Sequence, residues 1–217
     1  MPDAHTFVVF GVASLALLIV PGPAVFYIVT RSIADGRRAG AVSMLGIEAG
    51  GLVHVAAAAL GVSALLASSA TAFAVVKYLG AAYLIYLGVR QLLRTIAEVD
   101  GAEVVAMSTP RLFWQGFMVQ VLNPKVALFF LAFLPQFIDP TRGVVELQVI
   151  VLGVAFTLLA LLSDGLYVLA VGTVANVVGA RTPRREWLTK LGGGVYIGLG
   201  VIAALSGPRP AATNTSG

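Results

Sequence analysis

Four ionisable side chains stand inside long apolar stretches of this sequence and could do chemistry there: Glu48, His54, Lys125 and Asp164. Inserting such a group into a bilayer costs about 2.5–3.5 kcal/mol, so each one is a functional candidate by default. Burial favours the neutral form of a carboxylate and a nearby cation favours its charged form, so a change of contacts can load or release a proton. We expect Asp164 to carry such a proton, with Glu48 as the alternative. His54 is either a further proton carrier or a packed hydrogen-bonding side chain.

Two proline motifs would break the apolar helices that contain them. The first is Pro21-Gly22-Pro23, followed by Ala24, and the second is Asn123-Pro124-Lys125. A proline inside a helix removes a backbone hydrogen bond, and in hydrocarbon the freed carbonyls must face protein or a water-filled cavity. The second half of each broken helix would begin near the bilayer midplane with free N–H groups, which suit a carboxylate. Paired breaks in two halves of a chain indicate a transporter binding site.

Lys125, at the second break, has two interpretations. It could pair with Asp164 or Glu48 and merely neutralise their charges, or it could contact the carboxylate of a substrate. The residues that we expect to bind a substrate are those of the two breaks and one aromatic side chain in mid-helix: Pro21, Gly22, Pro23, Ala24, Asn123, Pro124, Lys125 and Tyr83.

The composition indicates an integral membrane protein. Of 217 residues, 59% are hydrophobic and 11% are charged, whereas a soluble domain carries about 25% charged residues. The fourteen Lys and Arg are scattered and form no basic face, which excludes a nucleic-acid partner. Without cysteine there is no disulfide, thiolate zinc site or iron–sulfur cluster. An all-oxygen metal site around Glu48, Asp164 and Asn123 is conceivable, but we expect neither a metal nor a cofactor.

Six apolar stretches are long enough to span a bilayer, which takes about 20 residues. They cover about residues 6–30, 40–65, 70–93, 112–138, 146–177 and 188–206. We therefore expect an all-α membrane protein with a single transport domain over residues 1–206 and a disordered tail over 207–217. Gly46 and Gly50 in the second stretch fit the small-xxx-small pattern of close helix packing.

The distribution of basic residues predicts the orientation in the membrane. The loops after the first, third and fifth helices carry ten Lys and Arg, and the opposite side carries two or three. Basic residues concentrate on the cytoplasmic side, so both termini are expected outside the cell.

Three helices per half is an odd number, so an internal repeat would have to be inverted, with halves of about 6–93 and 112–206. Residues 79–89 and 191–201 share six identities in eleven positions. In a chain this rich in Leu, Gly, Ala and Val such a match can arise by chance, but the interruption of both the first and the fourth helix supports the repeat.

Several motifs follow one another along the chain: Pro21-Gly22-Pro23, Gly36-Arg37-Arg38-Ala39-Gly40, Leu60-Gly61, the run from Lys77 to Gly88, Phe113-Trp114-Gln115-Gly116-Phe117, Asn123-Pro124-Lys125 and Phe133-Leu134-Pro135-Gln136-Phe137. Together they resemble the LysE/RhtB family of amino-acid exporters, over nearly the whole chain except the tail. The resemblance implies a multi-pass protein of the bacterial inner membrane that exports amino acids or close derivatives by proton antiport. Its partners would be a small zwitterionic substrate, protons and the lipid bilayer, and a homodimer is compatible with the sequence.

Two other functions are open at this point. A divalent-cation exporter could share the six-helix plan. A membrane-embedded enzyme acting on lipids would show clustered acidic or His motifs at the membrane surface, and the predicted loops hold none. We therefore expect a transporter and no enzyme.

Overall fold

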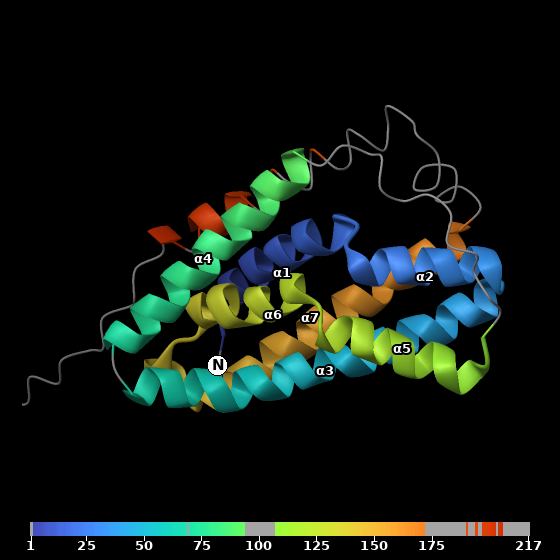
Figure 1. Ribbon diagram of the computed structural model, residues 1–217. Helices are drawn as coiled ribbons and strands as arrows, with labels where there is room; N and C mark the ends of the chain where they lie inside the picture. The colour runs from blue at the N-terminus through green and yellow to red at the C-terminus, as the bar shows by residue number, and fades with distance from the viewer. Residues whose placement is uncertain are drawn as a thin grey trace, which may run out of the picture.

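The computed structural model describes residues 2–68, 70–93 and 107–171, together with 190, 194, 197–202 and 204–205. Over these residues the chain consists of helices and short connections and contains no strand, so the predicted all-α fold is confirmed there. The connection 94–106, most of 172–196 and the predicted tail 207–217 lie outside the described residues. Figure 1 shows helices that lie alongside one another as a bundle.

The first predicted span is two helices, α1 (Ala4–Ile19) and α2 (Pro23–Ala34), bent by 51° at the break between them. Val20 is extended, as expected before a proline. Gly22 is the N-cap of α2, and Pro23 occupies its first turn, where a missing N–H costs nothing. The predicted break therefore lies where the prolines stand.

The fourth predicted span is also broken. Helix α5 (Thr109–Val121) meets α6 (Pro124–Leu128) at a bend of 41°, with Asn123 as the N-cap of α6. The chain continues through a π-helical turn, η2 (Phe129–Phe133), and a 3-10 turn, η3 (Leu134–Phe137). A second proline, Pro135, stands in η3 and offers no N–H to the turn before it.

Three longer helices complete the described part of the fold: α3 (Arg37–Ser68), α4 (Ala70–Leu93) and α7 (Val145–Leu169). By length and apolar composition α7 and residues 37–61 of α3 could each cross a membrane, and each bent pair could add one span, giving up to four among the described residues. The predicted third helix is present as α4, and the sixth, at 188–206, lies largely outside the described residues. The structure therefore supports a helical membrane protein, and the six-helix inverted repeat stays a prediction.

Helix α3 packs against α5 and α7, and Figure 1 shows it alongside them at the lower edge of the view. A Cβ at Gly46 would overlap the backbone carbonyl of Phe113, and one at Gly116 would overlap the carbonyl of Ser43. A Cβ at Gly50 would lie only 2.6 Å from the Phe117 carbonyl oxygen. The backbones of α3 and α5 can approach this closely only because these positions are glycine, which confirms the predicted packing role of Gly46 and Gly50.

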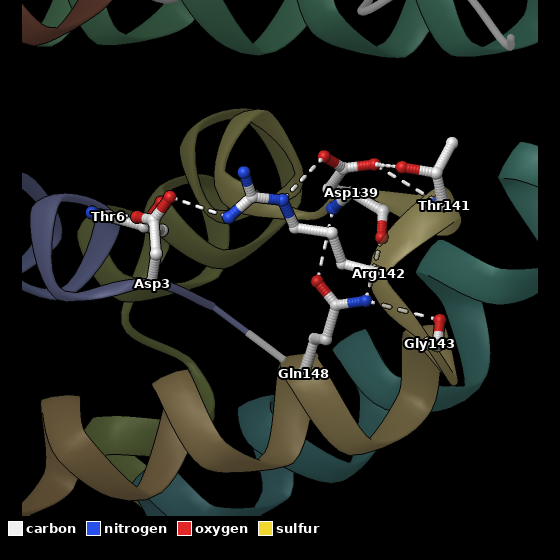
Figure 2. A network of polar contacts seen from close by, with 7 residues as sticks. All are labelled: Asp3, Thr6, Asp139, Thr141, Arg142, Gly143 and Gln148. Atoms are coloured by element: carbon white, nitrogen blue, oxygen red, sulfur yellow. Dashed lines mark hydrogen bonds and ion pairs between the residues drawn. The ribbon is translucent and has the colours of Figure 1, made fainter.

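A polar network joins the start of α1 to the connection before α7 (Figure 2). Asp3 is the N-cap of α1, and its carboxylate accepts hydrogen bonds from the Thr6 N–H at 2.8 Å and from Arg142 at 2.6 Å. The buried amide of Gln148 donates to the carbonyl of Asp139 at 2.8 Å and accepts from its N–H at 3.1 Å. The N-terminus and this connection therefore lie at the same end of the bundle, as the predicted topology requires.

Two neighbours determine the protonation of Asp3. The backbone N–H and the hydroxyl of Thr6, and then Arg142, hold the pKa of its carboxyl well below the usual range. A lowered folded-state pKa means that the contact contributes stability above the unfolded-state pKa of about 4, and loses it only as the pH falls through the lower folded-state value. The network therefore persists at mildly acidic pH.

Candidate functional site

At the break between α1 and α2, side chains of other helices cap two backbone carbonyls. The carbonyl of Ile19 would accept from the N–H of residue 23, but that residue is Pro23, which has none. The Tyr167 hydroxyl donates to this carbonyl at 2.9 Å. The next carbonyl, that of Val20, accepts from the Lys125 ammonium at 2.6 Å. Side chains of α7 and α6 therefore cap the end of α1.

On the other side of the break, the start of α2 has N–H groups that no side-chain cap satisfies. The N-cap is Gly22, and its carbonyl already accepts from the Phe26 N–H at 3.0 Å. Pro23 has no N–H, so the donors of the first turn are those of Ala24 and Val25. These two groups stand at the positive end of the helix dipole, and such an end can bind a carboxylate.

The second break is closed by its own N-cap. The buried side chain of Asn123 accepts from the Lys125 N–H at 3.1 Å and donates to the side-chain oxygen of Gln120, also at 3.1 Å. The Ala127 N–H bonds the Asn123 carbonyl, and Pro124 has no N–H to offer. The structure thus gives Asn123 a capping role, and the predicted contact of Asn123 and Pro124 with a substrate stays a prediction.

His54 caps a carbonyl at the second break. The Gln120 carbonyl would accept from the N–H of residue 124, which is Pro124, and it accepts instead from the Asn123 N–H at 2.9 Å and from His54 Nε2 at 2.8 Å. Because a carbonyl can only accept, Nε2 carries a hydrogen. The ring of His54 also stacks on Phe130 at a centroid distance of 6.3 Å. His54 therefore has both a hydrogen-bond partner, Gln120, and a packing partner, Phe130, as its interpretation as a packed hydrogen-bonding side chain requires.

Three of the four ionisable residues come together from three different helices. Glu48 on α3, Lys125 on α6 and Asp164 on α7 are all buried, with 8%, 6% and 4% of their surface exposed. Asp164 lies close enough to both other residues for their charges to interact. One carboxylate oxygen of Glu48 has no hydrogen-bond partner among the described residues. A buried cation and two buried carboxylic groups therefore form one cluster beside the first break.

The start of α2 lies in the same region. Ala24 packs against the small buried cluster of Ile28, Ile47 and Val168, and the last two lie one residue before Glu48 and four residues after Asp164. The two N–H donors of the first break thus stand near the charged cluster. The N–H groups at the break can donate to one negative group, and the carboxylic groups of Glu48 and Asp164 can bind one positive group.

Two tyrosines complete the comparison with the predicted site residues. Tyr83 is on α4, 40% exposed, and its ring contact is with Tyr86 on the same helix, so its contact with a substrate stays a prediction. Tyr167 was not predicted. Its spacing of three residues from Asp164 was the available signal, because residues three apart share one face of a helix. Within the described part of the chain, no three acidic or His side chains are grouped to hold a metal ion.

Comparisons with known proteins agree on one family. Residues 15–207 match the family model described as LysE type translocator. The chain is 29% identical to the uncharacterized membrane protein YrhP of Bacillus subtilis (strain 168), over 93% of this chain and 100% of that protein. It is 31% identical to a homoserine/homoserine lactone efflux protein of Salmonella typhi, over 88% and 92% of the two chains, and 31% identical to a leucine efflux protein of Klebsiella pneumoniae, over 71% and 70%. No solved structure matches the chain.

Proposed function

The chain belongs to the LysE family of translocators, which are transporters and not enzymes, and we propose that it exports amino acids or close derivatives in exchange for protons. Relatives named for the efflux of leucine and of homoserine or its lactone support a substrate of this class. We also propose the cytoplasmic membrane as its location.

The observation that carries the proposal is the charged cluster beside the open start of α2. The Ala24 and Val25 N–H groups and the Lys125 ammonium can bind a carboxylate. Glu48 and Asp164 can bind the ammonium group of the same molecule, since both are buried within reach of each other's charge. An α-amino acid carries its ammonium and its carboxylate group on the same carbon, so it matches this arrangement.

In this proposal Lys125 also links substrate binding to the shape of the first break. Its ammonium donates to the neutral carbonyl of Val20. A substrate carboxylate would compete for that ammonium, because its full negative charge attracts a cation more strongly than the partial charge of a carbonyl oxygen does. Substrate binding would then release α6 from the end of α1 and allow the two broken helices to move apart.

Exchange with protons follows if one buried carboxylate binds either the substrate ammonium or a proton, but not both. Asp164 is our candidate, because it interacts with both Lys125 and Glu48. On the outer face the substrate would leave and a proton would take its place. On the cytoplasmic face the proton would leave and a new substrate would bind.

Everted membrane vesicles test this function. Their lumen corresponds to the outside of the cell, so an acidic lumen should drive accumulation of labelled amino acids from a panel of basic, neutral and hydroxylated members. A protonophore should abolish the accumulation, and vesicles without the protein serve as the blank. If labelled divalent cations accumulate and no amino acid does, the function is that of a cation exporter.

The proposed orientation makes a separate prediction. The chain contains no cysteine, so an introduced cysteine is the only thiol present. Val144, which is 63% exposed before α7, should be on the outer side, and Ala102, outside the described residues, on the cytoplasmic side. In intact cells an impermeant thiol reagent should label Val144→Cys, and it should label Ala102→Cys only after lysis. Labelling of Ala102→Cys in intact cells would overturn the orientation.

A further inference from the structure

We propose that Tyr167 and His54 are matched positioning residues, each of which holds one helix break in its substrate-receptive shape by capping the carbonyl that stands four residues before a proline. This inference rests on the proposed transport function and adds a role for two side chains. It stands on hydrogen-bond geometry at both breaks.

At the first break, the lost partner is the N–H that Pro23 lacks. The Ile19 carbonyl stands four residues before this proline, and the Tyr167 hydroxyl donates to it at 2.9 Å. The side chain of Ile19 is 56% exposed, so the end of α1 lies at the surface of the chain. A bare carbonyl at membrane depth is strongly disfavoured, and the tyrosine hydroxyl supplies the donor.

At the second break, Pro124 removes the N–H that would bond the Gln120 carbonyl, which again stands four residues before the proline and keeps one backbone donor, the Asn123 N–H at 2.9 Å. His54 Nε2 donates to this oxygen at 2.8 Å. Stacking on Phe130 fixes the plane of the imidazole ring. The two breaks therefore share one geometry, namely a carbonyl, a proline four residues later, and a ring-bearing donor from a neighbouring helix.

The two donors lie on the two helices that carry the buried carboxylic groups. Glu48 and His54 are both on α3, and Asp164 and Tyr167 are both on α7. Each of these helices thus brings an acidic group to the cluster and a hydrogen-bond donor to one break. Movement of α3 or α7 would shift its acidic group and its hydrogen-bond donor at the same time. The charge of the cluster and the bend of the broken helices would then change together.

The capping bonds act on the site indirectly. They are made to carbonyls on the near side of each break, whereas the proposed carboxylate donors, Ala24 and Val25, are on the far side of the first one. Loss of a cap should let the end of α1 shift and misalign these donors. The expected consequence is weaker substrate binding with little change in the maximal rate.

Tyr167→Phe and His54→Phe test this directly, because each keeps an aromatic ring and removes the donor. Each should raise the KM for export about tenfold, the effect of about one lost hydrogen bond, and change the maximal rate less than about twofold. His54→Gln, which retains an N–H donor, should restore part of the loss. Tyr86→Phe removes a hydroxyl from a tyrosine that is 53% exposed on α4 and serves as the matched control.

A double-mutant cycle tests the capping itself without any transport. Replacement of Pro21, Gly22 and Pro23 by alanine favours a continuous helix, in which the N–H of residue 23 reaches the Ile19 carbonyl, so the hydroxyl of Tyr167 should no longer be needed. In purified protein, Tyr167→Phe alone should lower the unfolding temperature by about 2–6 °C. In the background of this triple replacement the same change should have almost no effect. Replacement of Asn123 and Pro124 by alanine, combined with His54→Phe, forms the corresponding cycle at the second break.

Three results would overturn the proposal. The first is equal destabilisation by Tyr167→Phe in both backgrounds, which would mean that its hydroxyl does not serve the Ile19 carbonyl. The second is that Tyr167→Phe and His54→Phe change the KM no more than the control Tyr86→Phe does. The third is destabilisation with an unchanged KM, which would make both residues structural only. If wild-type vesicles export nothing, the proposed function fails, while the thermal cycles still report on the caps.

Discussion

Asp164→Asn should abolish gradient-driven accumulation of substrate and leave substrate exchange across the membrane intact. With one proton per substrate and a pH difference of about two units, wild-type vesicles can accumulate substrate about 100-fold, because each pH unit corresponds to a factor of ten. The variant should reach no accumulation at any pH difference. The measurement is the ratio of labelled substrate inside and outside everted vesicles, beside the rate of counterflow without a gradient.

Asp164→Asn should abolish accumulation because asparagine matches the size of aspartate but cannot bind and release a proton. Asp164 is 4% exposed and interacts electrostatically with both Lys125 and Glu48. It is therefore the group whose charge depends most on the neighbours that substrate binding would rearrange. Exchange of substrate for substrate moves no net proton, so it needs only the binding site. There the amide oxygen of the asparagine can still accept a hydrogen bond from the substrate ammonium, and Glu48 keeps its carboxylic group.

Glu48→Gln is the matched variant for this experiment. It removes the other buried carboxylic group of the cluster, which has one oxygen without a partner among the described residues. If Glu48→Gln abolishes accumulation while Asp164→Asn still accumulates substrate, then Glu48 carries the proton. Unchanged accumulation in both variants would contradict proton exchange through this cluster.

Replacement of Pro21, Gly22 and Pro23 by alanine should lower the apparent affinity for substrate about 100-fold or more. Alanine supplies the missing N–H groups and favours a continuous helix over the 51° bend. The N–H groups of Ala24 and Val25 would then bond the Val20 carbonyl and the carbonyl of residue 21 within one helix. The loss of two hydrogen bonds to a charged group, at about 1.5–3 kcal/mol each, accounts for the size of the effect.

Membrane insertion should survive this change, because alanine is tolerated throughout an apolar helix. Gly11→Ala in α1 is a suitable control, since a Cβ at this position would meet no atom within 4 Å. The assay compares substrate binding and export at equal amounts of inserted protein. Unchanged transport in the triple variant would mean that Pro21-Gly22-Pro23 only bends the helix and does not bind substrate.

Much of the local structure was predictable from the sequence. The composition requires membrane helices, and a proline cannot continue a hydrogen-bonded helix, so Pro23 and Pro124 determine where the two bends fall. The capping role of Asn123 also follows from local rules, because Asn is a favoured N-cap and Pro suits the next position. The cost of burying ionisable groups marked Glu48, Lys125 and Asp164 as candidates before any contact was known.

The partners of the freed carbonyls depended on the tertiary structure. Tyr167 reaches Ile19 across 148 residues of sequence, and His54 reaches Gln120 across 66. Such contacts depend on how each helix is rotated about its axis. A membrane helix that is apolar on all sides carries little periodicity to reveal its rotation. For the same reason the mid-helix position of Tyr83 does not tell which way its side chain points; packing leaves it 40% exposed beside Tyr86, and its role in the path stays a prediction. Sequence thus determined which groups need partners, and helix packing decided which side chains supply them.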